Sequence, residues 1–262
     1  MSNVTNKVVW ITGASSGIGE ALAINYSKKG AKVILSARRE EELNRVANSC
    51  SGETFCQVLD LSKTDDFESI VNTIISQFKR IDILINNGGI SQRSEAYKTT
   101  LEVDRKLMEV NYFGTVALTK AVLPVMQKQK SGHFVAISSL SGKFGFFLRS
   151  AYSASKFALV GFYESLRLEE EKNNIKVSIV FPGFVLTKIS QNSLSGDGEK
   201  HGQLDNNQKG GISAEKCAND IVKGVAKEKH EILSGGTEKY GVLIHRLFPS
   251  LFYKILRKKK GS

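Results

Sequence analysis

Between residues 12 and 19 the chain reads Thr-Gly-Ala-Ser-Ser-Gly-Ile-Gly, after an apolar run at Lys7–Ile11 and at the start of an amphipathic pattern at Gly17–Lys29. Glycines between a strand and a helix permit a tight turn, a close backbone approach to a ligand and free N–H groups at the helix start. The spacing is G-x-x-x-G-x-G, not the common G-x-G-x-x-G, and such glycines can be purely structural. Their position after the first strand favours a cradle for a dinucleotide pyrophosphate, with contacts from Gly13, Ser15, Ser16, Gly17, Ile18 and Gly19.

Outward from this stretch, short β-branched runs alternate with longer amphipathic segments. The runs that predict strands are Lys7–Ile11, Lys32–Ser36, Phe55–Asp60, Asp82–Ile85, His133–Ile137, Lys176–Phe181 and Glu231–Leu233. The patterns that predict helices include Gly17–Lys29, Glu40–Cys50, Asp65–Phe78, Val103–Lys128 and Ala151–Glu170. This alternation predicts an α/β fold of the Rossmann type, a doubly wound parallel sheet of about seven strands in three α/β/α layers. One such series favours a single domain over residues 1–262.

The composition excludes several classes of protein. The 262 residues are 41% hydrophobic and 24% charged, which excludes disordered, collagen-like and low-complexity chains. No apolar run reaches about 18 residues, and no separate apolar segment precedes Lys7, so neither a membrane span nor a secretory signal is expected. Three cysteines without a C-x-x-C pair form neither a disulfide framework nor a zinc site, which favours a reducing, cytoplasmic location.

The positive charge is concentrated at the end of the chain. The formal net charge is +11, and residues 239–262 contain seven lysines and arginines and no acidic residue. The remaining 238 residues are nearly balanced, with 30 basic and 26 acidic side chains. Because no helix-turn-helix, finger or RNA-recognition pattern is present, nucleic-acid binding is not expected.

The end of the second predicted strand indicates which dinucleotide is bound. An Asp or Glu at this place would hydrogen-bond the ribose hydroxyls of NAD, but the chain has Arg38 and Arg39. Guanidinium groups match the geometry of a phosphate, so the pair favours NADP(H). A solvated arginine pair is the alternative, although the dipole of the following helix disfavours cations at its start.

A tyrosine and a lysine lie four residues apart in the predicted helix Ala151–Glu170, so Tyr152 and Lys156 share one face of it. A phenol titrates near pH 10, and a neighbouring ammonium favours the phenolate and lowers that pKa. Ser139, just past the fifth predicted strand, could hydrogen-bond a substrate oxygen. Its spacing to Tyr152 favours it over Ser138. A Tyr-x-x-x-Lys pair is common by chance, but its combination with the glycine turn is not.

With these motifs the chain resembles the short-chain dehydrogenase/reductase family from about Lys7 to Thr187. Asn86-Asn87-Gly88-Gly89 is similar to the family's N-N-A-G segment, with Gly88 in place of Ala. The resemblance implies a catalytic tetrad of Asn111, Ser139, Tyr152 and Lys156. It implies cofactor contacts from Gly13, Ser15, Ser16, Gly17, Ile18, Gly19, Arg38, Arg39, Asp60, Leu61, Asn87, Gly88, Tyr152, Lys156, Pro182, Gly183, Val185 and Thr187.

The resemblance also implies a reaction. Hydride passes between NADP(H) and a carbonyl or secondary alcohol, with Tyr152 as general acid or base, Ser139 polarising the carbonyl, Lys156 holding the ribose, and Asn111 supporting a proton path. No metal is required, and a homodimer or homotetramer is implied. The alternatives are an NADP(H)-binding sensor or scaffold without catalysis, and an epimerase or dehydratase. The complete tetrad argues against the sensor, and the short C-terminal part argues against the third class.

The substrate is indicated less directly. Ser190–Gly211 is a linker-like segment after the sixth predicted strand, where open α/β sheets hold ligands, and this favours a substrate lid over a disordered segment. Four phenylalanines could give the pocket an apolar wall suited to a lipophilic carbonyl such as a steroid, retinoid or fatty aldehyde: Phe144, Phe146, Phe147 and Phe184. Ordinary core or lid packing is the alternative for each of them.

The extension over residues 239–262 is amphipathic and basic. Apolar residues recur at helical spacing around Pro249, namely Ile244, Leu247, Phe248, Leu251, Phe252, Ile255 and Leu256. This pattern is typical of a helix that lies on an anionic membrane surface, and peripheral membrane contact is one interpretation. A helix that docks in a homodimer is the other.

Overall fold

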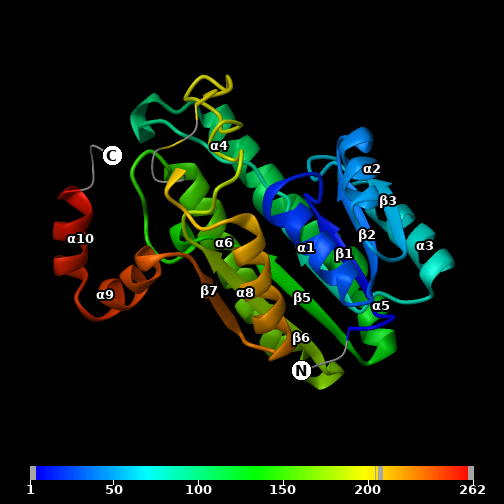
Figure 1. Cartoon of the computed structure of the whole chain (residues 1–262). Coiled ribbons are helices and arrows are strands. Elements are labelled where there is room, and N and C mark those ends of the chain that lie inside the picture. Colours follow the sequence, from blue (N-terminus) through cyan, green and yellow to red (C-terminus); the bar gives the residue numbers. More distant parts are fainter. Residues whose placement is uncertain (1–3, 204, 206–208, 259–262) are drawn as a thin grey trace.

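The computed structural model describes residues 4–203, 205 and 209–258. Its centre is a parallel sheet of seven strands in the order β3-β2-β1-β4-β5-β6-β7 (Figure 1). The strands are β1 (Val8–Thr12), β2 (Lys32–Ala37), β3 (Thr54–Val58), β4 (Ile83–Asn86), β5 (Gly132–Ile137), β6 (Ile175–Pro182) and β7 (Glu231–Ser234). The predicted Rossmann-type fold is therefore confirmed, and each predicted strand boundary lies within two residues of the observed one.

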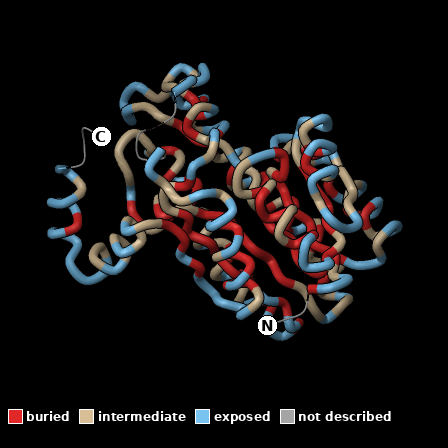
Figure 2. Tube along the Cα trace, in the orientation of Figure 1, coloured by how far each residue is buried: buried red, intermediate tan, exposed pale blue. Residues whose placement is uncertain are grey.

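Helices cover both faces of the sheet and enclose two apolar cores. On one face, α1 (Gly17–Lys28), α2 (Glu40–Asn48) and α8 (Ala214–Ala226) pack against strand residues such as Val9 and Ile11. On the other, α3 (Phe67–Phe78), α5 (Gly114–Gln129) and α6 (Ser150–Glu170) pack against Val8 and Trp10. Neighbouring residues of β1 thus enter opposite cores, as the two-residue period of a strand requires. Figure 2 shows that the strands are largely buried.

The predicted helix Val103–Lys128 is wrong in one respect, because the structure divides it. Helix α4 (Leu101–Met108) passes into a π-helical turn at Glu109–Phe113, and α5 follows. After the turn, Gly114 lies close to the loop between β3 and α3. A Cβ on Gly114 would stand 1.9 Å from the Leu61 carbonyl oxygen in that loop. Single π turns are often found at functional sites, and this one contains Asn111.

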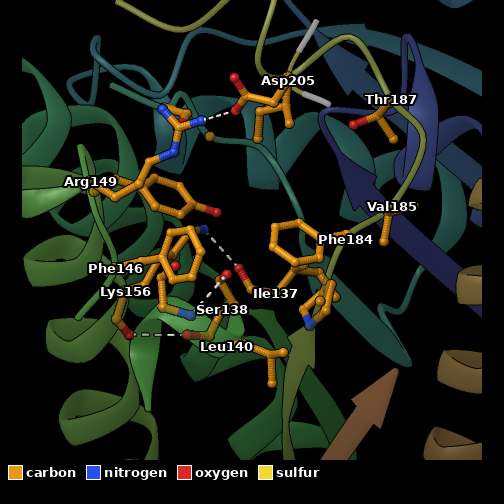
Figure 3. Close-up of a pocket in the computed structure, with 18 of the residues that line it drawn as sticks. Ile137, Ser138, Leu140, Phe146, Arg149, Lys156, Phe184, Val185, Thr187 and Asp205 are labelled. Carbon is orange, nitrogen blue, oxygen red and sulfur yellow. Dashed lines mark hydrogen bonds and ion pairs between the residues drawn. The ribbon is translucent and has the colours of Figure 1, made fainter. Parts of the chain in front are cut away.

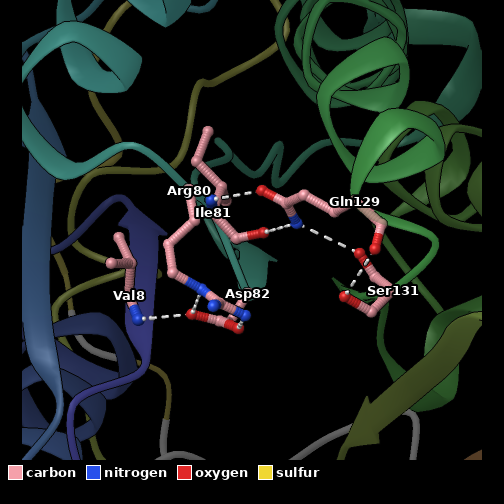
Figure 4. Close-up of polar contacts among 6 residues, drawn as sticks. All are labelled: Val8, Arg80, Ile81, Asp82, Gln129 and Ser131. Atoms are coloured by element: carbon pink, nitrogen blue, oxygen red, sulfur yellow. Dashed lines mark hydrogen bonds and ion pairs between the residues drawn. The ribbon is translucent and has the colours of Figure 1, made fainter.

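The amino end of the sheet is held by a group of polar contacts (Figure 4). The Asp82 carboxylate accepts hydrogen bonds from the Val8 backbone N–H (2.8 Å) and from Nε of Arg80 (2.9 Å). The Gln129 side chain accepts from the Ile81 N–H (3.0 Å) and donates to the Ile81 carbonyl (2.9 Å). These contacts fix the start of β4 against β1 and against the end of α5.

After β7 the chain continues through a short 3-10 turn (Thr237–Tyr240) into α9 (Gly241–Leu247) and α10 (Pro249–Lys258). Both helices extend away from the sheet on the side of β7 (Figure 1). The predicted break at Pro249 is confirmed. The apolar residues of the extension divide into two groups. Ile244, Phe252 and Leu256 pack against the body, while others are exposed: Leu247, Phe248, Leu251 and Ile255.

Two further expectations from the sequence concern membrane-spanning helices and the segment 190–211. Within the described residues, no helix combines the length and apolar character that crossing a bilayer requires. The described part of 190–211 forms turns and isolated bridges, one joining Gln92 to Leu194 and another joining Leu194 to Lys200. Residues 204 and 206–208 of the predicted lid, and 259–262 of the basic extension, lie outside the described residues.

Candidate active site

The glycine turn joins β1 to α1 at the carboxyl end of the sheet. Gly13 (φ 64°) and Gly17 (φ 60°) adopt left-handed backbone conformations that favour glycine. A Cβ on Gly13 would stand 2.8 Å from the Gly88 Cα, and one on Gly19 would stand 2.2 Å from the Gly13 carbonyl oxygen. Ser16 precedes α1 without a side-chain capping bond, so the first N–H groups of this helix are not capped by it. The turn therefore fits a phosphate held by backbone donors.

Polar contacts connect this turn to the end of β4. The Thr12 hydroxyl oxygen accepts from the N–H groups of Asn87 (3.0 Å) and Gly88 (2.9 Å), and the Asn87 amide donates to the Thr12 carbonyl (3.0 Å). The neighbouring strands β1 and β4 lie where the strand order reverses, which is the ligand crevice of open α/β sheets. A Cβ on Gly88 would stand 2.8 Å from Cδ1 of Leu61, which gives a physical reason for glycine here.

Arg38 and Arg39 are exposed beyond the end of β2. The neighbouring Asp60 accepts hydrogen bonds from the Ser62 N–H (3.0 Å) and hydroxyl (2.8 Å). Burial raises the pKa of the Asp60 carboxyl, but the Ser62 hydrogen bonds and the charge of Arg38 outweigh this and hold the pKa below its usual value. Arg38 and Asp60 are thus electrostatic neighbours at the edge where the sequence predicts the adenosine end of the cofactor.

A pocket lies next to this crevice, at the carboxyl ends of β4, β5 and β6 (Figure 3). Nine of the predicted site residues line it: Ile18, Asn87, Ser139, Tyr152, Lys156, Pro182, Gly183, Val185 and Thr187. The predicted apolar wall is also present, formed by Phe144, Phe146, Phe147 and Phe184. The other predicted contacts lie outside this lining, namely Gly13, Ser15, Ser16, Gly17, Gly19, Arg38, Arg39, Asp60, Leu61, Gly88 and Asn111.

Tyr152, Ser139 and Lys156 come together in the pocket wall. The Ser139 side chain acts to lower the pKa of the Tyr152 phenol, whereas the Ser138 hydroxyl donates to the Lys156 carbonyl (3.1 Å). Both serines line the pocket, and Ser139 as the catalytic serine stays a prediction. Lys156 is 5% exposed, its Nζ donates to the Ile137 carbonyl (2.9 Å), and the Nζ lies 5.7 Å from the centroid of the Tyr152 ring.

The two titratable groups respond to burial in opposite directions. Burial lowers the pKa of Lys156 to about 8, because the charged ammonium is disfavoured in an apolar setting. Burial raises the pKa of the Tyr152 phenol above 10, against the opposing effects of the Ser139 hydrogen bond and the positive charge of Arg149. The sequence assigned the lowering of the Tyr152 pKa to Lys156. In the structure the groups that act in that direction are Ser139 and Arg149.

Asn111 lies behind the pocket wall and is completely buried. Its Oδ1 accepts from the Ile90 N–H (2.8 Å), and its Nδ2 donates to the Ile90 carbonyl (2.9 Å) and the Ser155 hydroxyl (3.0 Å). A Cβ on Gly89 would stand 3.0 Å from Oδ1 of Asn111 and 3.6 Å from Nζ of Lys156, so both residues border Gly89. Asn111 therefore holds the loop after β4 in place beside the lysine.

Sequence reasoning missed four charged residues of the pocket: Arg93, Arg149, Asp205 and Glu238. Asp205, from the predicted lid, forms ion pairs with Arg93 (2.9 Å) and with Arg149. A second N–H group of Arg149 donates to the Gln92 carbonyl. Arg149 precedes Tyr152 by about one helical turn, and this spacing is the signal in the sequence that could have identified it. Nothing local in the sequence connects Arg93 with Asp205.

The parallel sheet, the glycine turn at its switch point and the adjoining pocket with its tyrosine and lysine define a nucleotide-binding oxidoreductase with a Rossmann fold. A family model described as short chain dehydrogenase matches residues 7–198. The chain belongs to the short-chain dehydrogenase/reductase family.

Two relatives match nearly the whole chain. A protein of Anopheles gambiae described as "Dehydrogenase/reductase SDR family protein 7-like" is 43% identical over 266 residues, covering 98% of this chain and 84% of the relative. A mouse protein described as "Dehydrogenase/reductase SDR family member 7B" is 43% identical over 272 residues, with the same coverage of 98% and 84%.

Solved structures show the same fold. A short-chain dehydrogenase/reductase from Burkholderia phymatum in complex with NAD has a TM-score of 0.84 at 22% identity, covering 96% of both chains. A metagenomic short-chain oxidoreductase in complex with NADP has a TM-score of 0.72 at 28% identity, covering 88% of this chain and 98% of that one. One of these neighbours is thus described with NAD and the other with NADP.

Proposed function

We propose that this protein is an NADP(H)-dependent carbonyl reductase, or the corresponding alcohol dehydrogenase, for a lipophilic substrate. The observation that carries the proposal is the convergence of Ser139, Tyr152 and Lys156 in one pocket wall, where the Ser139 side chain acts to lower the pKa of the Tyr152 phenol. A non-catalytic cofactor-binding sensor would not need these three groups to converge. Reduction is the favoured direction because it is the usual task of NADPH.

The residues of the pocket divide the work. Bound nicotinamide would supply the hydride in reduction. The Ser139 hydroxyl donates a hydrogen bond to the substrate carbonyl oxygen and draws electron density toward it. Tyr152 gives its phenol proton to that oxygen as the alcohol forms, and the Ser139 side chain and the charge of Arg149 favour the phenolate that remains. Lys156, whose Nζ lies 5.7 Å from the centroid of the Tyr152 ring, would hold the nicotinamide ribose. Asn111 keeps the loop at Ile90 in position without reaching the pocket.

The preference for NADP(H) is proposed from the two exposed arginines beyond β2. Arg38 acts electrostatically on Asp60, so its charge lies close to the expected adenosine site. No acidic residue occupies the place after β2 where a carboxylate would bind the ribose hydroxyls of NAD. A guanidinium at this place suits a 2′-phosphate.

The test is consumption of NADPH and of NADH against a panel of aldehydes, ketones and ketosteroids. Arg38→Asp should shift the ratio of kcat/KM for NADPH over NADH by about tenfold or more toward NADH, because it replaces a charge-assisted hydrogen bond with repulsion. Arg39→Asp is the matched control and should shift the ratio less. An unchanged ratio in both variants would overturn the NADP assignment. Tight NADPH binding without turnover of any panel member would favour the sensor.

A lipophilic substrate is proposed from the pocket wall. Phe146 and Phe184 meet edge to face with centroids 6.0 Å apart, and Phe146 contacts Phe147 at 6.4 Å. Such a wall favours apolar carbon next to the reacting carbonyl. Among the panel compounds, kcat/KM should rise with the length of an alkyl ketone, and a series with no such trend would contradict this part of the proposal.

We also propose that the extension formed by α9 and α10 makes peripheral contact with an anionic membrane. Its outward apolar residues are accompanied by exposed basic ones: Leu243, Leu247, Phe248 and Leu251 are 49–60% exposed, beside Arg246, Lys254, Arg257 and Lys258. Such a surface combines apolar burial with attraction to anionic headgroups.

Vesicle co-sedimentation tests the membrane contact with vesicles that contain or lack phosphatidylserine. Leu247→Asp and Leu251→Asp should abolish binding to the anionic vesicles, whereas Leu168→Asp, at an exposed apolar residue of α6, should not. A homodimer or homotetramer is the state that we propose for the protein in solution. If Leu247→Asp and Leu251→Asp instead dissociate the oligomer and leave vesicle binding unchanged, the outer face of α9 and α10 is a subunit interface.

A further inference from the structure

Two arginines in the pocket wall have no contact with the substrate or the cofactor assigned to them in the proposed reaction. Arg93 lies in the loop after β4, and Arg149 lies at the start of α6, three residues before Tyr152. Their guanidinium groups converge on one carboxylate, since Arg93 contacts Oδ1 of Asp205 and Arg149 contacts Oδ2. Figure 3 shows the second of these contacts. The side chains are well covered, with 29% exposure for Arg93, 11% for Arg149 and 12% for Asp205.

The charges in this cluster do not balance. Two cations meet one anion, and the other charged residues that line the pocket are engaged elsewhere. Lys156 donates to the Ile137 carbonyl, and Glu238 accepts from the backbone N–H groups of Phe184 (2.9 Å) and Gly236 (3.0 Å). The described lining therefore keeps one positive charge in excess on a largely enclosed arginine pair. A covered charge without a counter-charge is unfavourable, so an anion that joins Asp205 on the pair, or a dianion that replaces it, would lower that cost.

We propose that Arg93 and Arg149 form a subsite for an anionic group, a carboxylate or a phosphate, carried by the carbonyl substrate, and that Asp205 occupies this subsite before the substrate binds. The proposal rests on the carbonyl reductase function proposed above. Arginine presents planar, paired donors that match carboxylate and phosphate oxygens, and Asp205 demonstrates that the space between the two guanidiniums accepts a carboxylate. The substrate would then be amphiphilic, with its chain against the phenylalanines and its anion on the arginines.

The same contacts could serve only to hold residues 190–211 against the body, and the two explanations predict opposite results for one substitution. If Asp205 competes with the substrate anion, Asp205→Asn weakens the competitor and improves the use of anionic substrates relative to neutral ones. If the ion pairs are only a structural latch, the same change impairs anionic and neutral substrates alike.

The experiment uses two probes that differ in charge: a long-chain carboxylic acid with a methyl ketone at its far end, and the methyl ester of that acid. The readout is the ratio of kcat/KM for the acid over the ester, measured by NADPH consumption. Arg149→Gln should lower this ratio about tenfold, the loss expected for one hydrogen bond between charged groups. Arg93→Gln should lower it less because Arg93 is more exposed, and Asp205→Asn should raise it.

Three controls make the result decisive. Arg105→Gln removes the same charge from an exposed position on α4 and should leave the ratio unchanged. Arg149→Lys keeps the charge and loses the paired donors, so it should restore the ratio only in part even where Arg149→Gln folds poorly. An alkyl phosphate with the same methyl ketone end shows which anion the subsite prefers.

The subsite and the proposed reaction can fail separately. Equilibrium binding of the acid and the ester to the NADPH complex is measured by calorimetry, with no turnover needed. Tighter binding of the acid that is lost in Arg149→Gln supports the subsite even if neither probe is reduced, a result that would count against the reductase function. Equal binding of acid and ester, or an equal loss of both in Asp205→Asn, overturns the subsite while turnover of the ester preserves the reductase.

Discussion

At the amino end of the sheet the Asp82 carboxylate meets one arginine and a backbone N–H group, while at the carboxyl end the Asp205 carboxylate meets two arginines in a pocket. Asp82 and Asp205 are covered to a similar degree, with 7% and 12% of their side chains exposed. Their partners differ, because Arg80 is 52% exposed and Arg149 is 11% exposed. The two clusters therefore differ. At the amino end the charges are balanced and the carboxylate also binds a backbone N–H group. At the carboxyl end the cluster carries one excess positive charge and faces a cavity.

The comparison predicts that changes at the carboxyl end affect rate while changes at the amino end affect stability. Tyr152→Phe is the strongest test of the first half. Loss of the phenol should reduce kcat about a thousandfold, the usual contribution of a general acid or base. The melting temperature and NADPH affinity should stay near those of the wild type. A variant that keeps a tenth or more of the wild-type kcat would remove Tyr152 from the mechanism.

His133, at the start of β5, tests the expected effect of the amino end on stability, measured as a function of pH. Burial lowers its pKa from 6.5 to about 4, so below pH 6.5 the unfolded chain binds a proton that the folded chain does not. Stability is therefore lost as the pH falls from 6.5 to 4, by up to about 3 kcal/mol. His133→Gln should flatten this part of the profile, measured by urea unfolding. The exposed His230→Gln should not. Parallel profiles for all three proteins would show that His133 is not the group responsible.

Asp82→Asn should cost about 2 kcal/mol of unfolding free energy, because it weakens hydrogen bonds to a charged acceptor that joins β4 to β1. The value of kcat/KM should be unchanged, since Asp82 lies at the opposite end of the sheet from the pocket. Arg80→Gln removes the exposed partner and should cost less than about 1 kcal/mol. A large loss of kcat/KM in a folded Asp82→Asn protein would break the distinction between the two ends.

Gly88→Ala is expected to have the smallest effect of these substitutions. It tests whether a change at the carboxyl end of the sheet can also affect stability. The added Cβ would stand 2.8 Å from the mobile end of the Leu61 side chain, so we expect a loss of about 1 kcal/mol from overpacking. Leu61→Ala in the same protein should relieve the contact, which a double-mutant cycle measures as a coupling between the two sites. Simple additivity of the two losses would show that the chain accommodates alanine by another route.

Patterns that repeat along the chain made the fold predictable. Each strand and the glycine turn are local features, and the same is true of the pair Tyr152 and Lys156, whose spacing is one turn of a helix. The π turn around Asn111 escaped prediction because the segments on either side share the same helical periodicity, and one widened turn leaves no mark in composition. The arginine cluster escaped because Arg93, Arg149 and Asp205 meet only through the tertiary fold.

Spacing along the chain predicts which residues share the pocket, but it does not predict which charges act on Tyr152. Whether a positive charge acts on Tyr152 depends on the direction of each side chain, and in the structure Lys156 turns to the Ile137 carbonyl while Arg149 lies close enough to influence the phenol. The apolar residues of α9 and α10 likewise divide between the body and the surface according to the angle at which the helices leave β7, which helical spacing alone does not determine.

The contact between Phe252 and Phe144 connects the C-terminal extension to the wall of the pocket. Phe252 is the buried residue of α10, and its ring lies 4.6 Å from that of Phe144, which lines the pocket. A binding event that shifts this aromatic pair changes the shape available to the substrate. By thermodynamic reciprocity, a substrate that presses on Phe144 must alter the affinity of the tail for its partner by the same factor. If the extension contacts a membrane as proposed, recruitment to that surface and occupancy of the pocket are thermodynamically linked.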